Sequence, residues 1–172
     1  MRRCFPELLG GLLAVVLAGS VQATSRHHDG EARVWMNGEQ LCVGATGTYE
    51  VGGLFSGSAK VADNVVTLHA VSVLRDAKET WAQSVPPGKP GAGLRLLADQ
   101  CIGYGSLPAD FVASTPAQPL QAGMYEVYLL AGDQKRRRAW FYKRFCLERD
   151  GEGWRVGEAR FVENAGQWQC AP

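Results

Sequence analysis

The sequence has few of the residues that carry catalysis and none of the motifs that arrange them. It contains three histidines. It has no G-x-S-x-G, no S-x-x-K, no H-E-x-x-H and no phosphate-binding loop. Paired carboxylates leave no such signature, so convergence of acidic residues stays open as an alternative for Asp63, Asp76, Asp99 and Asp110. The sequence therefore predicts a protein that is not an enzyme and that uses no cofactor or metal.

Long apolar runs are also scarce, and the one that stands out lies at the start of the chain. It extends from Leu8 to Ala18, after Arg2 and Arg3, and Val21-Gln22-Ala23 follows it as a cleavage site of the A-x-A kind. This pattern predicts a secretory signal peptide over residues 1–23. No later run approaches the roughly 20 apolar residues that a membrane-spanning helix needs. We therefore expect export, to the periplasm, and no transmembrane segment.

Net charge is nearly absent. The full chain carries a formal charge of +1, and removal of Arg2, Arg3 and Glu7 with the signal peptide leaves zero. A balanced charge favours neither nucleic acid nor an anionic membrane surface as a partner. Residues 24–172 have the length of a single domain with one hydrophobic core.

Cysteines are few and widely spaced, with no C-x-x-C pair, which argues against a zinc site. Four remain after cleavage, and in an oxidising compartment an even number favours disulfides. Of the three possible pairings we favour one, which ties the C-terminal tail to the strand that contains Cys146. The predicted bonds are Cys42–Cys101 and Cys146–Cys170.

Strand patterns occur throughout, whereas a convincing helical period does not. The clearest is a hairpin from Met124 to Glu148, whose two arms are rich in Tyr, Trp, Phe, Val and Leu. Asn37-Gly38 predicts a second, tight hairpin. Residues 65–75 are apolar in both phases, as in a central strand, and the histidine within them, His69, is expected to pack rather than to catalyse.

The remaining segments complete an all-β pattern. Residues 44–64 are interpreted as a short strand and a loop, and residues 154–162 as an edge or solvent-facing strand. Prolines and glycines predict loops over residues 84–93 and 106–123. Short strands between such turns predict an antiparallel, Ig-like β-sandwich stapled by disulfides, with a small barrel as the alternative.

Several short motifs occur in an order that resembles a known family. They are Leu41-Cys42-Val43 after the Asn-Gly turn, Cys101-Ile102 before Tyr104-Gly105, Leu120–Gly123 before Tyr125-Glu126-Val127, and Tyr142 through Phe145-Cys146-Leu147. Together, over about residues 32–162, they resemble the periplasmic lipoprotein-like immunity proteins of type VI secretion systems. The resemblance implies a β-sandwich that binds and neutralises a cognate effector toxin without catalysis. A ligand-binding or envelope-structural β-domain of the periplasm is the alternative.

Two features are candidates for contact with such a partner. The first is Phe111, an apolar residue in a proline-rich loop, which would either anchor a partner or fold back under its own loop. The second is the run of positive charges at the hairpin tip, which is either a solvated turn or an electrostatic handle for an acidic partner. That run comprises Lys135, Arg136, Arg137 and Arg138.

A lipid anchor is not expected, because Ser20 follows Leu17-Ala18-Gly19 at the position where a lipoprotein signal carries its acylated cysteine. Cells that express the protein and are fed a clickable fatty acid should therefore show no label on it, and the mature chain should begin at Thr24. Incorporation of the fatty acid would contradict this prediction.

Overall fold

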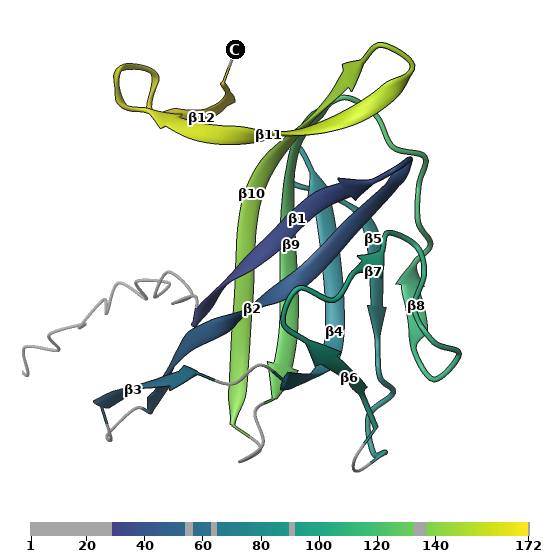
Figure 1. Cartoon of the computed structure of the whole chain (residues 1–172), viewed down its shortest axis with the longest axis vertical. Helices are drawn as coiled ribbons and strands as arrows, with labels where there is room; N and C mark the ends of the chain where they lie inside the picture. The colour runs from purple at the N-terminus through teal and green to yellow at the C-terminus, as the bar shows by residue number, and fades with distance from the viewer. Residues whose placement is uncertain (1–28, 54–56, 63–64, 90–91, 133–136, 172) are drawn as a thin grey trace, which may run out of the picture.

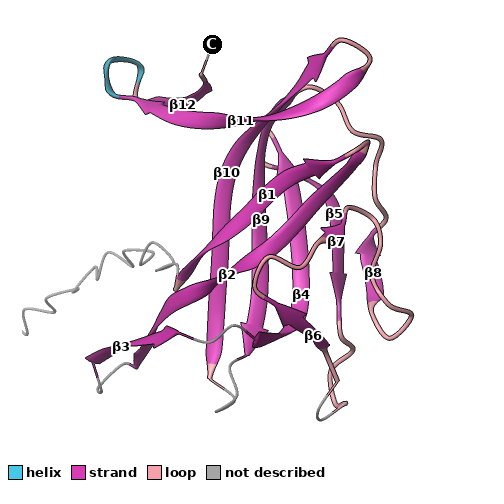
Figure 2. Cartoon of the chain, in the orientation of Figure 1, coloured by secondary structure: helices cyan, strands magenta, loops and turns pink. Residues whose placement is uncertain are grey.

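The computed structural model describes residues 29–53, 57–62, 65–89, 92–132 and 137–171, and its strands dominate the part described (Figures 1 and 2). The prediction of an all-β protein is confirmed, and the single helix among these residues is a short 3-10 turn over Glu163–Ala165. The strands are β1 (Gly30–Asn37), β2 (Gln40–Gly53), β3 (Gly57–Ala62), β4 (Val65–Arg75), β5 (Lys78–Ser84), β6 (Leu94–Leu97), β7 (Ile102–Gly103), β8 (Val112–Thr115), β9 (Gly123–Gly132), β10 (Arg138–Asp150), β11 (Gly153–Val162) and β12 (Gln167–Cys170).

The strands form one curled sheet and not the two stacked sheets of the predicted sandwich. Their main order is β3-β2-β1-β10-β9-β4-β5-β8, with β6 and β7 paired to β4 and β2. The antiparallel part of the prediction is also incomplete, because β1 pairs with β10 in parallel. The result is a mixed half-barrel, closer to the small barrel that the sequence left as the alternative.

The sheet curls because two strands, β1 and β11, share one edge of β10. β9 pairs along the other edge through most of its length. On the shared edge, β1 pairs only at Gly30 and Glu31, and β11 pairs from Phe145 onward. Having left β10, β1 continues in its hairpin with β2 and crosses diagonally over the strands behind it (Figure 1). The hydrophobic core lies between this hairpin and the β10-β9-β4-β5 strands.

Glycine makes the contact between β1 and β10 possible. A Cβ atom at Gly30 would lie 2.7 Å from the Phe141 ring and 2.8 Å from the Tyr49 side chain. The backbone N–H of Asp29 donates to the Trp140 carbonyl over 2.9 Å, and the Trp140 N–H donates to the Asp29 carboxylate over 2.7 Å. Asp29, which precedes β1, is therefore held to β10 by two hydrogen bonds.

The predicted hairpins are confirmed. The central hairpin is β9–β10, paired from Gly123 with Leu147 to Gly132 with Arg138. The first hairpin is β1–β2, although its two-residue loop is Gly38-Glu39, one position later than the Asn-Gly pair. Gly38 has φ +59°, and a glycine with positive φ at the first loop position is typical of a type II′ turn.

Strand β4 is central, as predicted, and its two apolar phases have a structural cause. It lies between β9 and β5, and it also pairs with β6. Opposite β9 the register shifts between Leu68 and Ala70, so that His69 is the extra residue of a β-bulge. Core-facing positions therefore change phase, from Val66 and Leu68 before the bulge to Val71 and Val73 after it.

Both predicted disulfides are present. Cys42–Cys101 joins β2 to the segment between β6 and β7, and Cys146–Cys170 joins β10 to β12. Disulfides of this kind are typical of proteins that fold in an oxidising compartment outside the cytosol. The signal peptide over residues 1–23, with Ser20, lies outside the described residues. Among those described, no helix is long and apolar enough to cross a membrane.

Three further segments differ from the sequence-based expectation. Residues 44–53 continue the long strand β2 and 57–62 form β3, where a short strand and a loop were expected. The expected loop over 106–123 contains β8, which pairs with β5. The C-terminal tail forms β12, in which Trp168 is 40 % exposed.

The β4–β5 turn offers a direct test of backbone strain. Asp76 and Ala77 both have positive φ, 49° and 64°, as a two-residue type I′ turn requires, but neither is glycine. Replacing Ala77 by glycine should therefore raise the free energy of unfolding by roughly 0.5–1 kcal/mol, measured as a higher urea midpoint.

The matched control is Gly38→Ala, which places alanine at φ +59° with no atom within 4 Å of its new Cβ. This variant should lose about 1 kcal/mol from backbone conformation alone. An Ala77→Gly variant with an unchanged or lower midpoint would contradict the argument.

Candidate protein-binding face

The sheet presents a second apolar face, on the side away from the core. Side chains alternate between the two faces of a strand, so the positions between the buried residues of β4, β9 and β10 point outward. The outward positions of an exposed sheet are ordinarily polar. Here they are half-buried and largely aromatic or aliphatic. We call this set the outer face: Ala70, Ser72, Leu74, Glu126, Tyr128, Leu130, Trp140, Tyr142 and Arg144.

Strand register arranges the outer face in three rows across β4, β9 and β10. The first row is Ala70, Leu130 and Trp140, and it is wholly apolar. The second contains Ser72, Tyr128 and Tyr142, and the third contains Leu74, Glu126 and Arg144. Each row is a set of directly opposed cross-strand neighbours, the pairs that contribute most to sheet stability.

An ion pair supports the third row. The Nε atom of Arg144 donates to Glu126 Oε1 over 2.9 Å, and its Nη2 also contacts the same oxygen. Both side chains are only 18 % exposed. Tyr128 donates its hydroxyl to Glu126 Oε2 over 2.6 Å. The carboxylate is therefore shared between a guanidinium and a phenol, which fixes all three side chains.

The two tyrosines remain neutral donors. Burial, with the hydrogen bond to Glu126, raises the pKa of Tyr128, and burial with the nearby Glu126 charge raises the pKa of Tyr142. Their rings lie 4.9 Å apart. Because the phenols keep their protons at physiological pH, this row adds aromatic surface without adding negative charge.

The outer face is hollowed next to its apolar row. The hollow has a volume of about 410 Å³, and its wall runs from Trp140 and Leu130 across Ala70 to Leu74. Tyr128, Ser72 and Glu79 of β5 provide its polar atoms. The hollow is open to solvent and apolar at its centre. Such a site can accept an apolar or aromatic side chain.

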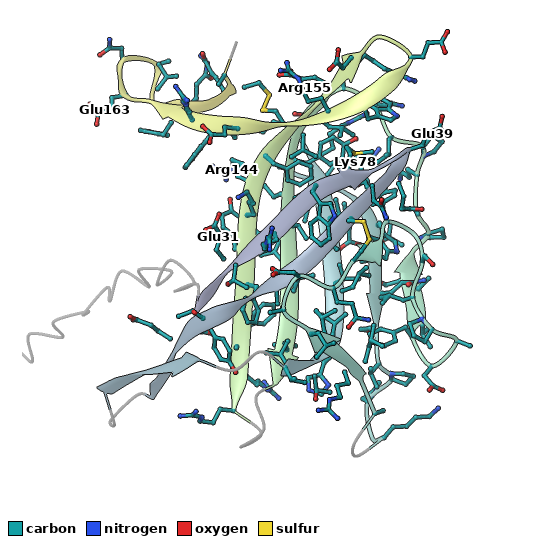
Figure 3. The ribbon with its side chains drawn as sticks, in the orientation of Figure 1. Glu31, Glu39, Lys78, Arg144, Arg155 and Glu163 are labelled. Atoms are coloured by element: carbon teal, nitrogen blue, oxygen red, sulfur yellow. A yellow bond between two sulfur atoms is a disulfide. The ribbon has the colours of Figure 1, made fainter. Side chains whose placement is uncertain are left out.

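A projecting arm borders the other end of the outer face. It consists of the part of β11 beyond Glu158 together with β12, and the disulfide Cys146–Cys170 ties it to β10. The Arg144 guanidinium lies 4.5 Å from the Trp168 ring centroid, within cation–π distance. Trp168 also contacts Phe161, which is 50 % exposed, edge to face. In Figure 3, Arg144 lies below this arm, and Glu31 lies further along the same side of β10.

The predicted contact residues fall in different places. Phe111 is 7 % exposed and belongs to the core, which fits the alternative that it folds back under its loop. Arg138 is exposed at the start of β10, and Arg137 is half-buried beside it. Lys135 and Arg136 lie outside the described residues. The loop around Phe111 is held to the sheet, since the Gln118 N–H donates to the Thr80 carbonyl over 2.9 Å.

Within the described ranges, the histidine and the aspartates that the sequence singled out lie in separate places. No cluster of three or more His, Cys, Asp and Glu side chains there is placed to hold a metal ion. His69 occupies the β4 bulge, where its ring packs against the backbone at Gly93 and Gly132. Asp76 and Asp99 lie in separate turns and pair with Arg75 and Arg33, and Asp63 is outside the described residues. His27 and His28, which precede Asp29, are also outside them.

Comparison with known proteins gives no match. No family model fits the chain, and no curated protein or solved structure is significantly similar to it. The outer face is therefore interpreted from its own geometry.

Sequence reasoning located the strands of the outer face but not the face itself. The signal was present, because the arms of the central hairpin are apolar or aromatic in both phases, as β4 is. Two apolar phases predict a strand covered on both sides. The structure shows that Trp140 and Tyr142 remain half-exposed.

The Glu126–Arg144 pair should matter more than the exposed pairs of the same type. Glu126→Gln leaves a mostly buried guanidinium without its counter-charge and should lower the free energy of unfolding by about 1–3 kcal/mol. Glu158→Gln is the matched control, since Glu158 and Arg160 are 76 % and 70 % exposed and lie 3.1 Å apart. It should change stability by less than about 0.5 kcal/mol. If urea unfolding shows that the two variants lose the same free energy of unfolding, the larger contribution of the Glu126–Arg144 pair is contradicted.

Proposed function

We propose that this chain is an exported immunity protein that binds and neutralises a cognate secreted toxin without catalysis, in the periplasm. The observation that carries the proposal is the outer face. It combines a half-buried Trp, two Tyr and an Arg on rigid strands, which are the side chains enriched at the centres of protein interfaces.

The frame around this face supports a binding role. Its strands are hydrogen-bonded along most of their length, so little conformational entropy is lost when a partner docks. The ion pair and the tyrosine hydrogen bond hold the polar side chains in place before binding. The order of short motifs that resembles immunity proteins of type VI secretion systems agrees with such a role.

A second candidate function is non-catalytic ligand binding in the periplasm. The observation that favours it is the hollow of about 410 Å³, a volume within the range of small-molecule sites. Its shallow, open form and the aromatic surface that continues beyond it fit a protein partner better.

Growth rescue tests the proposal. The reading frame next to this gene should encode a toxic protein, and its expression in the periplasm should stop growth. Coexpression of the full chain with its signal peptide should restore growth, because binding in the same compartment blocks the toxin. A chain without residues 1–23 is the control and should not rescue. Failure of the exported chain to rescue, or rescue only by the truncated chain, would contradict the proposal.

A further inference from the structure

The charges at the edges of the hollow differ in sign from one side to the other. On β5, the Glu79 carboxylate accepts hydrogen bonds from the Ser72 hydroxyl, over 2.9 Å, and from the Thr115 hydroxyl. Both donors are neutral, and within the described ranges no lysine or arginine pairs with Glu79. The side of the hollow toward β5 therefore has a negative charge that no basic side chain of the described residues neutralises.

The opposite side has a positive charge. Arg138 precedes Trp140 by two positions on β10, so its side chain leaves the strand on the same face, and it is exposed. Arg144, further along β10, is already neutralised by Glu126. β4 and β9 separate β5 from β10, so the axes of β5 and β10 lie about 14 Å apart across three strand spacings. Glu79 pairs with Leu74 in the third row, whereas Arg138 precedes the first row, so the two charges lie diagonally across the hollow from each other.

An apolar centre between two charged edges is the arrangement of a small protein-binding epitope. We infer that the hollow holds an apolar or aromatic anchor of a protein partner, whose neighbouring basic residue pairs with Glu79 and whose neighbouring acidic residue pairs with Arg138. This inference rests on the proposed function for the existence of a protein partner, and it adds the docking site, the chemistry of the anchor and its orientation.

Two short peptides separate the contribution of the aromatic anchor to binding from that of the flanking charges. Acetyl-Lys-Trp-Lys-amide and acetyl-Glu-Trp-Glu-amide share the anchor and differ only in charge. Titrated into the ¹⁵N-labelled mature protein, both should shift the backbone amide signals of Ser72, Tyr128 and Leu130. Signals of the β1–β2 turn should not move. Absence of shifts on the outer face with both peptides, or equal shifts over the whole surface, would overturn the inference.

Charge reversal should then affect one probe at a time. Glu79→Lys should weaken binding of the lysine peptide about fivefold, the scale of one exposed ion pair, and should not weaken binding of the glutamate peptide. Arg138→Glu should do the opposite. Glu39→Lys, on the exposed β1–β2 turn, is the matched control and should change neither affinity. Equal effects of Glu79→Lys on both peptides would refute the orientation.

Blocking the hollow tests the anchor. Ala70→Arg places a long charged side chain in its floor and should abolish binding of both peptides, whereas Ala109→Arg in an exposed loop should not. If Ala70→Arg does not fold, Glu79→Lys and Arg138→Glu still test the docking site. Both positions are exposed, so these variants should fold. In the growth assay, rescue by a folded Ala70→Arg chain would refute the docking site and leave the proposed function standing. Loss of rescue by the unaltered chain would refute the function itself.

Discussion

The shared edge of β10 is the constraint on which the rest of the structure depends. A strand edge can pair with only one partner at any position, and this edge is divided between β1 and β11. β1 must therefore leave after two paired residues, and it takes β2 with it across the core. β11 pairs beyond that point and then separates to form the arm with β12. Curling of the sheet and projection of the arm have the same cause.

The two disulfides stabilise the places where this arrangement lacks continuous hydrogen bonding. Cys101 lies in the short segment between β6 and β7, which connects β4 to β2 across the opening of the half-barrel. Cys170 lies at the end of the arm, in a four-residue strand whose residues are all exposed. Neither segment buries enough apolar surface to hold itself in place, so a covalent bond replaces part of a core.

Local patterns predicted much of the fold because they depend on neighbours in the sequence. The β9–β10 hairpin, the β1–β2 hairpin and the bounds of β4 follow from alternation and turn residues. The β1–β10 pairing does not, because it joins residues about a hundred positions apart and depends on a close approach at Gly30. The glycines of residues 44–64 favoured a short strand followed by a loop. β2 nevertheless continues to Gly53, since pairing with β1 and β3 outweighs the low strand propensity of glycine.

The candidate site was predicted less well than the fold, and the reason is physical. Exposed charge and proline-rich loops are visible in the sequence, and they drew attention to Phe111 and the basic tip. Phe111 is buried in the core, because removing its ring from water lowers the free energy of the folded state. Whether Trp140 is covered depends on where β1 crosses the sheet, which only the assembled structure determines. β1 and β2 cover one face of the β10-β9-β4 strands, and the aromatic residues of the opposite face stay half-buried at the surface.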